Sequence, residues 1–584
     1  MSLIMQRVKC ARCEGYNEFR TQQENAMSDN GPSKVEGIKE ASRQLRGGLA
    51  ETLKDTSVDH FNDDDVQLIK FHGFYQQDNR DQRKGGKQYS FMVRSRVPGG
   101  KLTAAQFLTE LEIADRWANG TLRITDRQAF QLHGVLKSDL RDTIRGINEC
   151  KLSTISACGD VCRNVMCCPA PIKSAVRDQL QADAQAMADF VRPKTTAYYE
   201  IWLKDGDESQ LVHEELVEEP LYGNLYLPRK FKIGFTLPED NCIDVYSQDL
   251  GFLAVVEGDR IVGYNVLVGG SMGMTPARKD TFPAVAKRLT YVPADRIFAI
   301  AEAVIKVQRD FGNRSDRKLA RMKYLIANWG LEAFKAKVEE YYGSSLPEPH
   351  PTEVTDVDDH LGWHEQGDGK LFLGVNVENG RIKDEGNLQL KTGLRAILQK
   401  YPVDCRLTAL QSFILCDIEP DWRDDINALL RQYGFTPADE LTLARRYSIS
   451  CPALPTCGLA VTEAERVMPQ VMDQIEAALA TQGLRNERIG VHMTGCPNGC
   501  ARPYSPDIGL VGKARGKYTL YLGGNVQCVR IAFLYEDMVP EEELGARLTP
   551  LFAYFKRERL PGEAFGDFCW RVGKEALQVA AASV

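Results

Sequence analysis

Four cysteines near the end of the chain have the type and spacing of metal-cluster ligands. Cys451 and Cys457 lie in SCPALPTCGLA, and Cys496 and Cys500 lie in TGCPNGCARPY. Four thiolates can hold a cubane iron–sulfur cluster, and the prolines between them favour open loops on which several sulfurs can converge. Structural zinc sites usually have a shorter spacing than that between Cys451 and Cys457. The pattern therefore predicts a redox centre, with zinc or ordinary buried cysteines as the alternatives.

Other cysteines could compete for this role. Cys158, Cys162, Cys167 and Cys168 form a dense group, but all four lie on one short segment, whereas the C-terminal pairs lie on two loops that could close on each other. Cys10 and Cys13 form a CxxC pair without two further ligands nearby, so we interpret that pair as incidental.

Basic residues recur at alternate positions in strand-like runs of the first half. Arg94 and Arg96 share one predicted strand face, and so do Lys230 and Lys232. Like charges on one face repel unless an anion neutralises them, which predicts a polyanionic ligand. Further basic residues of this set are Arg123, Arg127, Arg163 and Arg229. A single histidine on a strand, His133, is interpreted as a packed or hydrogen-bonding residue rather than an axial haem ligand.

The composition excludes several classes of protein. The chain has 584 residues and a net charge of −7, which gives no general reason to expect nucleic acid or an anionic membrane as partner. Sixteen cysteines in so long a chain do not form a disulfide scaffold, and their pairing indicates a reducing compartment, so we expect the cytoplasm. We expect no transmembrane helix, and the first 27 residues lack the pattern of a signal or transit peptide.

An internal repeat organises the chain. Residues 120–149 align with 403–432, and both segments predict two strands followed by an amphipathic helix. Flanking segments also align: 89–100 with 370–381, 157–168 with 450–461, 227–235 with 488–500, and 262–270 with 516–524. Duplication predicts an α+β fold of two pseudo-twofold halves with a site between them. Segments from both halves should interleave in one unit, and a helical stretch over about 285–343 leads through a Pro- and Asp-rich linker into the second half.

The cysteine motifs, together with LRITDRQAFQLHG, YLPRKFK, LGWHEQGDG and FGDF, resemble those of the sirohaem-containing assimilatory sulfite reductases. The resemblance runs in the same order over about residues 60–575. LGWHEQGDG and CARPY are more similar to the ferredoxin-dependent branch of the family. The resemblance implies a duplicated nitrite/sulfite reductase fold with three interleaved α/β domains and the cofactors at their junction.

The same resemblance implies boundaries for each part of the chain. They are an N-terminal arm (1–60), a first ferredoxin-like half-domain (61–156), a first sirohaem-binding domain (157–345), a second ferredoxin-like half-domain (357–440) that packs with 88–156, and an iron–sulfur and sirohaem domain (441–584).

The resemblance also implies two cofactors, a 4Fe-4S cluster and a sirohaem whose iron shares one cysteine thiolate with the cluster. The implied cluster ligands are Cys451, Cys457, Cys496 and Cys500, with Cys500 as the bridge. The implied sulfite-binding residues are Arg94, Arg163, Lys230 and Lys232. The implied sirohaem contacts are Arg123, Thr125, Arg127, Gln131, His133, Arg229 and Asn498.

The implied activity is the six-electron reduction of sulfite to sulfide with electrons from ferredoxin. The alternatives are the haemoprotein subunit of an NADPH-dependent sulfite reductase and a ferredoxin-nitrite reductase, although Lys232 favours sulfite because nitrite enzymes generally carry Asn there. A non-catalytic nucleic-acid-binding protein is a third reading, which the negative net charge disfavours. VGGSMG at 268–273 lacks nucleotide-binding spacing and is expected to be a close-approach loop. A basic patch of Arg502, Lys513, Arg515 and Lys517 is the candidate docking site for ferredoxin.

Overall fold

Four five-stranded sheets form the frame of the chain. The computed structural model describes residues 31–194, 201–205, 208–213, 218–276 and 278–582, so Cys10, Cys13 and the first half of the predicted arm lie outside the described residues. The four sheets form two pairs, each pair with one strand order, so the duplication and the predicted α+β fold are confirmed.

The two small sheets share one topology. The first has the order β1-β2-β5-β4-β15, from β1 (Phe74–Asp78), β2 (Tyr89–Ser95), β5 (Phe130–Val135), β4 (Leu122–Ile124) and β15 (Arg381–Ile382). The second has the order β13-β14-β19-β18-β3, from β13 (Gly362–Glu365), β14 (Leu371–Val375), β19 (Phe413–Ile418), β18 (Cys405–Leu407) and β3 (Lys101–Leu102).

Each small sheet takes its last strand from the other half of the chain. Strand β15 pairs with β4 through Arg381 and Arg123, and β3 pairs with β18 through Leu102 and Cys405. The two halves are therefore interleaved by a reciprocal exchange of two-residue strands.

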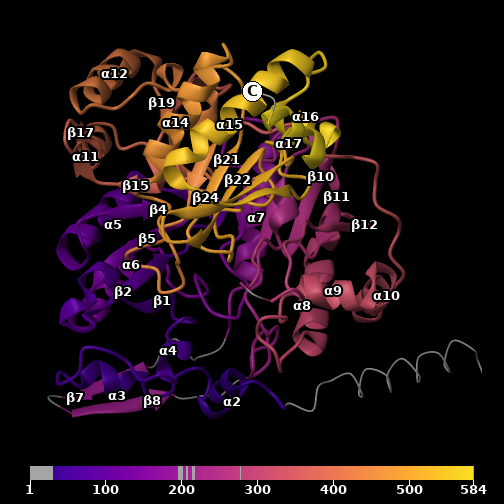
Figure 1. Ribbon diagram of the computed structural model, residues 1–584. Coiled ribbons are helices and arrows are strands. Elements are labelled where there is room, and N and C mark those ends of the chain that lie inside the picture. Colours follow the sequence, from indigo (N-terminus) through magenta and orange to yellow (C-terminus); the bar gives the residue numbers. More distant parts are fainter. Residues whose placement is uncertain (1–30, 195–200, 206–207, 214–217, 277, 583–584) are drawn as a thin grey trace, which may run out of the picture.

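Two helices accompany each small sheet. They are α5 (Ala104–Trp117) and α6 (Leu140–Glu149) in the first half, and α11 (Leu390–Lys400) and α12 (Arg423–Gln432) in the second. A capping box starts α5, because Thr103 Oγ1 accepts from the Gln106 amide at 3.2 Å and Gln106 Oε1 accepts from the Thr103 amide at 2.9 Å. Asp115 of α5 pairs with Lys391 of α11 at 2.6 Å, which joins the halves. The two helices lie on the same side of the molecule in Figure 1.

The two large sheets also share one topology. The first has the order β12-β11-β10-β9-β6, from β12 (Lys287–Pro293), β11 (Arg260–Val268), β10 (Leu250–Glu257), β9 (Ile233–Thr236) and β6 (Met166–Cys167). The second has the order β24-β23-β22-β21-β20, from β24 (Phe533–Pro540), β23 (Lys517–Leu522), β22 (Ile508–Ala514), β21 (Val491–Thr494) and β20 (Ser448–Ser450). In each sheet the last three strands are parallel and the first two are antiparallel.

Helices and the N-terminal segment surround these sheets. Helix α7 (Ala175–Phe190) contacts the first large sheet, while α14 (Met468–Thr481) and α15 (Leu544–Glu558) belong to the C-terminal core. Helices α2 (Lys34–Ala41) and α3 (Leu49–Lys54) lie at the bottom of the view in Figure 1, and Lys39 of α2 pairs with Asp160 at 3.2 Å. No helix within the described ranges has both the length and the apolar composition needed to cross a membrane.

Candidate functional site

The four C-terminal cysteines lie at one edge of the second large sheet. Cys451 directly follows β20, and Cys496 and Cys500 lie in the loop after β21. Because β20 and β21 are parallel neighbours, their carboxyl ends meet at the same edge. Hydrogen bonds hold the loops together, since the Gly495 amide donates to Cys451 Sγ at 3.3 Å and Asn498 Nδ2 donates to Cys496 Sγ at 3.4 Å.

The electrostatics of these cysteines are those of a cation-binding group. Burial and the neighbouring Cys500 raise the pKa of the Cys451 and Cys457 thiols, and the same causes raise the pKa of Cys496 to about 11. Four thiolates can therefore coexist here only around a positive centre. No three of these sulfurs lie within 4.8 Å of one another among the described residues, which is wider than a single tetrahedral ion requires. The donor set fits a multi-iron cluster, and exposed Cys500 leaves one sulfur open to a further group.

A polar row crosses the first small sheet. The strand register places Arg94 of β2 opposite Gln131 of β5, Gln131 opposite Arg123 of β4, and Arg123 opposite Arg381 of β15. The Gln131 amide, turned with its oxygen toward Arg94, accepts from Arg94 Nε at 3.3 Å. His133 lies in the same strand as Gln131, and its Nε2 is 3.3 Å from the Gln131 amide. Burial lowers the pKa of His133 well below its usual value, so the imidazole is neutral at pH 7.

Glu465 connects this row to the cysteine loops. Its carboxylate accepts from Arg123 Nε at 2.9 Å and from Arg381 Nε at 2.7 Å. Arg123 also donates to the Ser450 carbonyl at 2.8 Å, one residue before Cys451. Burial raises the pKa of the Glu465 carboxyl and the two arginines lower it, with a net value of about 2, so Glu465 is ionised.

The segment that leads into β9 carries two half-buried lysines, Lys230 and Lys232. Burial and the neighbouring Lys232 hold the pKa of Lys230 well below its usual value, and burial, Arg127 and Arg321 lower the pKa of Lys232 to about 7. Arg163 lies beside this segment, because its amide donates to the Phe231 carbonyl at 2.8 Å. Neighbouring positive charges are among the causes that lower the pKa of both lysines, which is the condition expected of an anion-binding site.

The remaining predicted residues lie near the same group of cations. Arg127 donates to Gln248 Oε1 at 2.8 Å and lies in the turn that begins at buried Thr125. Arg229 lies 3.9 Å from Asp160, and Cys500 influences the pKa of both Arg94 and Lys230. The structure thus brings the arginines and lysines of the first half next to the cysteine loops of the second.

Three expectations about individual residues were wrong. Arg96 does not share the environment of Arg94, because the chain bends after Ser95 and Arg96 Nη2 donates to the Ala188 carbonyl of α7 at 2.7 Å. Arg502 cannot dock a partner, since it is buried and paired with Asp244 at 2.6 Å. Segments 157–168 and 450–461 are not equivalent. Strand β6 lies at the end of the first segment, whereas β20 ends at the first residue of the second segment.

Two further basic residues near this site, Arg321 and Lys323, escaped the sequence interpretation. Arg321 Nη2 donates to Asp249 Oδ1 at 3.0 Å and to Asp249 Oδ2 at 2.8 Å. Asp249 in turn accepts from the Lys232 backbone amide at 2.8 Å. Lys323 is buried and donates to the Gly273 carbonyl at 2.6 Å. Arg321 and Lys323 alternate as the earlier basic pairs do, so the same signal could have found them; they lie in a stretch assigned as helical.

The 268–273 loop, predicted to approach the macrocycle closely, lies close to the cysteine loop. A Cβ atom on Gly273 would lie 3.0 Å from the Asn498 carbonyl oxygen, and the Met274 amide donates to the Pro497 carbonyl at 3.0 Å. Lys323 fixes the other side of this loop.

Comparisons with known proteins match this arrangement. The family model described as "Nitrite and sulphite reductase 4Fe-4S domain" matches residues 158–346. A second family model, "Nitrite/Sulfite reductase ferredoxin-like half domain", matches residues 81–150 and 364–433. A "Sulfite reductase [NADPH] hemoprotein beta-component" of Geobacillus thermodenitrificans is 46% identical over 551 residues, which cover 93% of this chain and 96% of that protein. The chain belongs to the nitrite and sulphite reductase family.

Other relatives of the family extend this result. A "Sulfite reductase [ferredoxin]" of Synechococcus elongatus is 46% identical over 566 residues, which cover 94% of this chain and 90% of that protein. The solved structure of the Mycobacterium tuberculosis NirA protein has the same fold, with a TM-score of 0.75 at 23% identity over 94% of this chain and 99% of NirA. The resemblance drawn from the motifs is confirmed, and sirohaem and a 4Fe-4S cluster are the cofactors of the family.

Proposed function

We propose that this protein reduces sulfite to sulfide. The observation that carries the proposal is the group of buried and half-buried cations, Arg94, Arg163, Lys230 and Lys232, beside the cysteine loops. Sulfur passes from +4 in sulfite to −2 in sulfide, so each turnover takes six electrons and seven protons and yields hydrosulfide and three waters. A dianionic substrate whose oxygens leave as water needs both positive charge and proton donors, and lysines and arginines provide them.

The residues divide into three groups in this proposal. Cys451, Cys457, Cys496 and Cys500 would hold the cluster, and Cys500 would be the ligand that it shares with the sirohaem. When bound, the two cofactors would supply electrons one at a time. Arg123, Thr125, Arg127, Gln131, His133, Arg229 and Asn498 hold the sirohaem and its carboxylates.

Arg94, Arg163, Lys230 and Lys232 bind sulfite in this proposal. The lowered pKa of Lys232, about 7, matters because an incoming dianion stabilises the ammonium form. Lys232 can then donate a proton at its Nζ and regain one from solvent near neutral pH.

Ferredoxin is the proposed electron donor, on the similarity of the LGWHEQGDG and CARPY motifs to the ferredoxin-dependent branch. The relatives named for ferredoxin and for NADPH match this chain with the same 46% identity, so the haemoprotein subunit of an NADPH-dependent enzyme is the second candidate. A ferredoxin-nitrite reductase is the third.

One steady-state experiment separates these candidates. Sulfide and ammonia formation are measured with reduced ferredoxin, and then with NADPH plus a flavoprotein reductase. We expect sulfide as the main product with ferredoxin. A higher kcat/KM for nitrite than for sulfite would contradict the substrate assignment, and turnover only with the flavoprotein would contradict the donor.

A further inference from the structure

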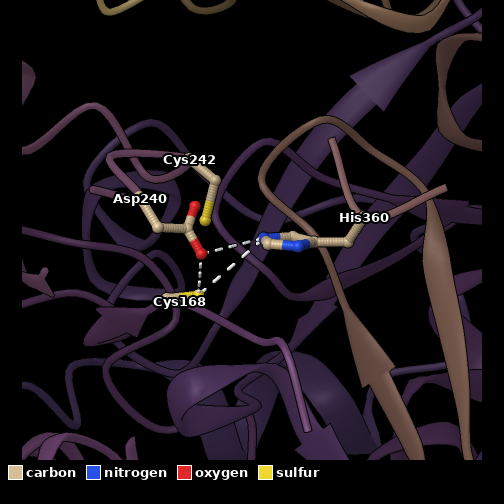
Figure 2. Close-up of side chains that lie close together, drawn as sticks. All are labelled: Cys168, Asp240, Cys242 and His360. Carbon is tan, nitrogen blue, oxygen red and sulfur yellow. Dashed lines mark hydrogen bonds and ion pairs between the residues drawn. The ribbon is translucent and has the colours of Figure 1, made fainter. Parts of the chain in front are cut away.

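A second group of metal-ligating side chains lies in the first half of the chain. Cys168, Asp240, Cys242 and His360 are all buried, and each offers a ligand atom within 4.8 Å of the others. Figure 2 shows the four side chains converging from three segments of the chain, with Asp240 and Cys242 on one of them. In the part of the chain that the structure describes, this is the one such group of three or more histidine, cysteine or acidic residues.

The distances within the group are close to those of a tetrahedral metal shell. Bonds of 2.0–2.3 Å from Zn²⁺ to nitrogen, oxygen and sulfur put neighbouring ligand atoms about 3.3–3.8 Å apart. His360 Nε2 lies 3.3 Å from Asp240 Oδ2 and 3.8 Å from Cys168 Sγ. Cys168 Sγ lies 2.7 Å from Asp240 Oδ2, a hydrogen bond that would lengthen by about 1 Å when a metal replaces the proton.

Two further features of the group call for a ligand. Asp240 Oδ1 is buried and has no hydrogen-bond partner among the described residues, and a buried orphan oxygen is costly. His360 has a φ of +60°, a left-handed backbone conformation that is uncommon outside glycine and that is often maintained at functional sites.

The duplication supplies independent support. The Gln128 side chain forms hydrogen bonds with both backbone groups of Cys167. Its Oε1 accepts from the Cys167 amide at 3.0 Å, and its Nε2 donates to the Cys167 carbonyl at 2.8 Å. Gln411 bonds both backbone groups of Ser450 in the same way, at 3.2 and 2.7 Å. Cys168 therefore occupies the place in the first half that Cys451 occupies in the second.

The other ligands follow the same equivalence. Asp240 and Cys242 lie in the loop after β9, and Cys496 and Cys500 lie in the loop after β21, which is the equivalent strand of the second large sheet. The cysteine loops of the two halves thus have matching positions, although the first half adds an aspartate and a histidine in place of two cysteines.

We propose that Cys168, Asp240, Cys242 and His360 bind one Zn²⁺ ion, separate from the iron–sulfur cluster. Two thiolates, one imidazole and one carboxylate form a complete tetrahedral shell without an open position, which is typical of a structural zinc site. Two thiolates are too few for an iron–sulfur cluster with four cysteine ligands.

The surrounding charges suit this ion. Zn²⁺ with two thiolates and one carboxylate has a net charge of −1, and Arg177 compensates it. Arg177 Nη1 donates to Cys168 Sγ at 3.0 Å and to Asp240 Oδ2 at 3.2 Å, as an outer residue that orients metal ligands would.

The ion would fasten the linker between the halves to the first large sheet. His360 lies at the end of the linker, directly before the second small sheet, while the other three ligands follow β6 and β9. Zinc should therefore stabilise the relative position of the two halves.

The test uses the holoenzyme purified without chelators and then incubated with equimolar Zn²⁺. Elemental analysis should give about one zinc per chain, and zinc-edge X-ray absorption should show about two sulfur and two nitrogen or oxygen neighbours. This measurement distinguishes the site from the iron cofactors and needs no variant.

Variants locate the site. Cys242→Ser and His360→Gln should each lower zinc content about tenfold or more. Cys569→Ser, which changes another buried cysteine in the C-terminal core, should retain it. Zinc well below one per chain in the wild type, a sulfur-only shell, or a disulfide between Cys168 and Cys242 in the purified protein would each overturn the proposal.

Discussion

At the scale of one residue, the positive charge of Lys232 should decide how efficiently the site reduces sulfite relative to nitrite. We expect Lys232→Asn to lower kcat/KM for sulfite by roughly one to three orders of magnitude, the loss of about 1.5–4 kcal/mol for a charged contact in a closed site. Because nitrite carries only one negative charge, kcat/KM for nitrite should fall less. Steady-state rates with both substrates and one donor measure the difference.

An exposed lysine provides the control for this substitution. Lys400 lies on the surface at the end of α11, and Lys400→Asn should leave both rates unchanged. Unchanged sulfite kinetics in Lys232→Asn would mean that this lysine does not face the substrate.

Cys500 is the exposed member of the four cysteines. We expect Cys500→Ser to abolish sulfite reduction and the electronic coupling of sirohaem to the cluster together, because serine is a poor replacement for a bridging thiolate. Sulfide formation and electron paramagnetic resonance measure the two effects.

The buried Cys528→Ser is the matched control and should retain activity. Wild-type iron and acid-labile sulfide near zero in well-assembled protein would contradict the cluster assignment.

At the scale of elements, Glu110 is a titratable residue on the buried face of α5. Burial raises its pKa to about 7, and Ser95 of β2 donates a hydrogen bond to it. The folded chain therefore binds more protons than the unfolded chain between pH 4.5 and 7, so this group reduces stability as pH rises through that window. The reduction is about 3 kcal/mol and is complete above pH 7.

Glu110→Gln should remove this penalty. We expect a thermal midpoint a few degrees above wild type at pH 8.5 and close to wild type at pH 4.5. Glu112→Gln, on the exposed face of the same helix, should show no such pH dependence. If the thermal midpoint of Glu110→Gln equals that of the wild type at both pH values, burial does not raise the pKa of the Glu110 carboxyl and the carboxyl is ionised in the folded protein.

The sequence could predict the long elements and could not predict the short ones. Strands β2, β5, β14 and β19 have clear alternation or apolar runs, and the repeat located their partners. Strands β3 and β15 have two residues each, and no pattern of that length specifies a partner in the other half.

The candidate site was predictable to a similar degree. The cysteines and the alternating lysines carry signals in their spacing, whereas Glu465 and His360 gain their contacts only from tertiary folding. Arg96 shows the limit of alternation, because the strand ends one residue before it.

At the scale of the whole molecule, partner docking concerns the turn between β22 and β23. Lys513, Arg515 and Lys517 are exposed there, and the Gly516 amide donates to Thr462 Oγ1 at 2.9 Å, next to the loop of Cys457. We expect Lys513→Glu with Arg515→Glu to raise the ferredoxin KM several-fold and to flatten its salt dependence, because rim charges act mainly on encounter.

Two controls accompany this variant. Turnover with reduced methyl viologen should stay nearly intact, and Lys556→Glu with Arg557→Glu on α15 should leave the ferredoxin KM unchanged. Equal losses with both donors would indicate damage to the cysteine loop and not lost docking.

The reciprocal exchange of β3 and β15 has a consequence for biosynthesis. Strand β4 leaves the ribosome more than 250 residues before Arg381 and Ile382, its outer neighbours, so it waits for about tens of seconds with an open edge. Open edges template association between nascent chains, and truncated products should therefore aggregate. A gene divided within the 346–360 linker, between residues 346 and 356, should yield two fragments that are insoluble when produced alone and that rescue each other when they are made in the same cell.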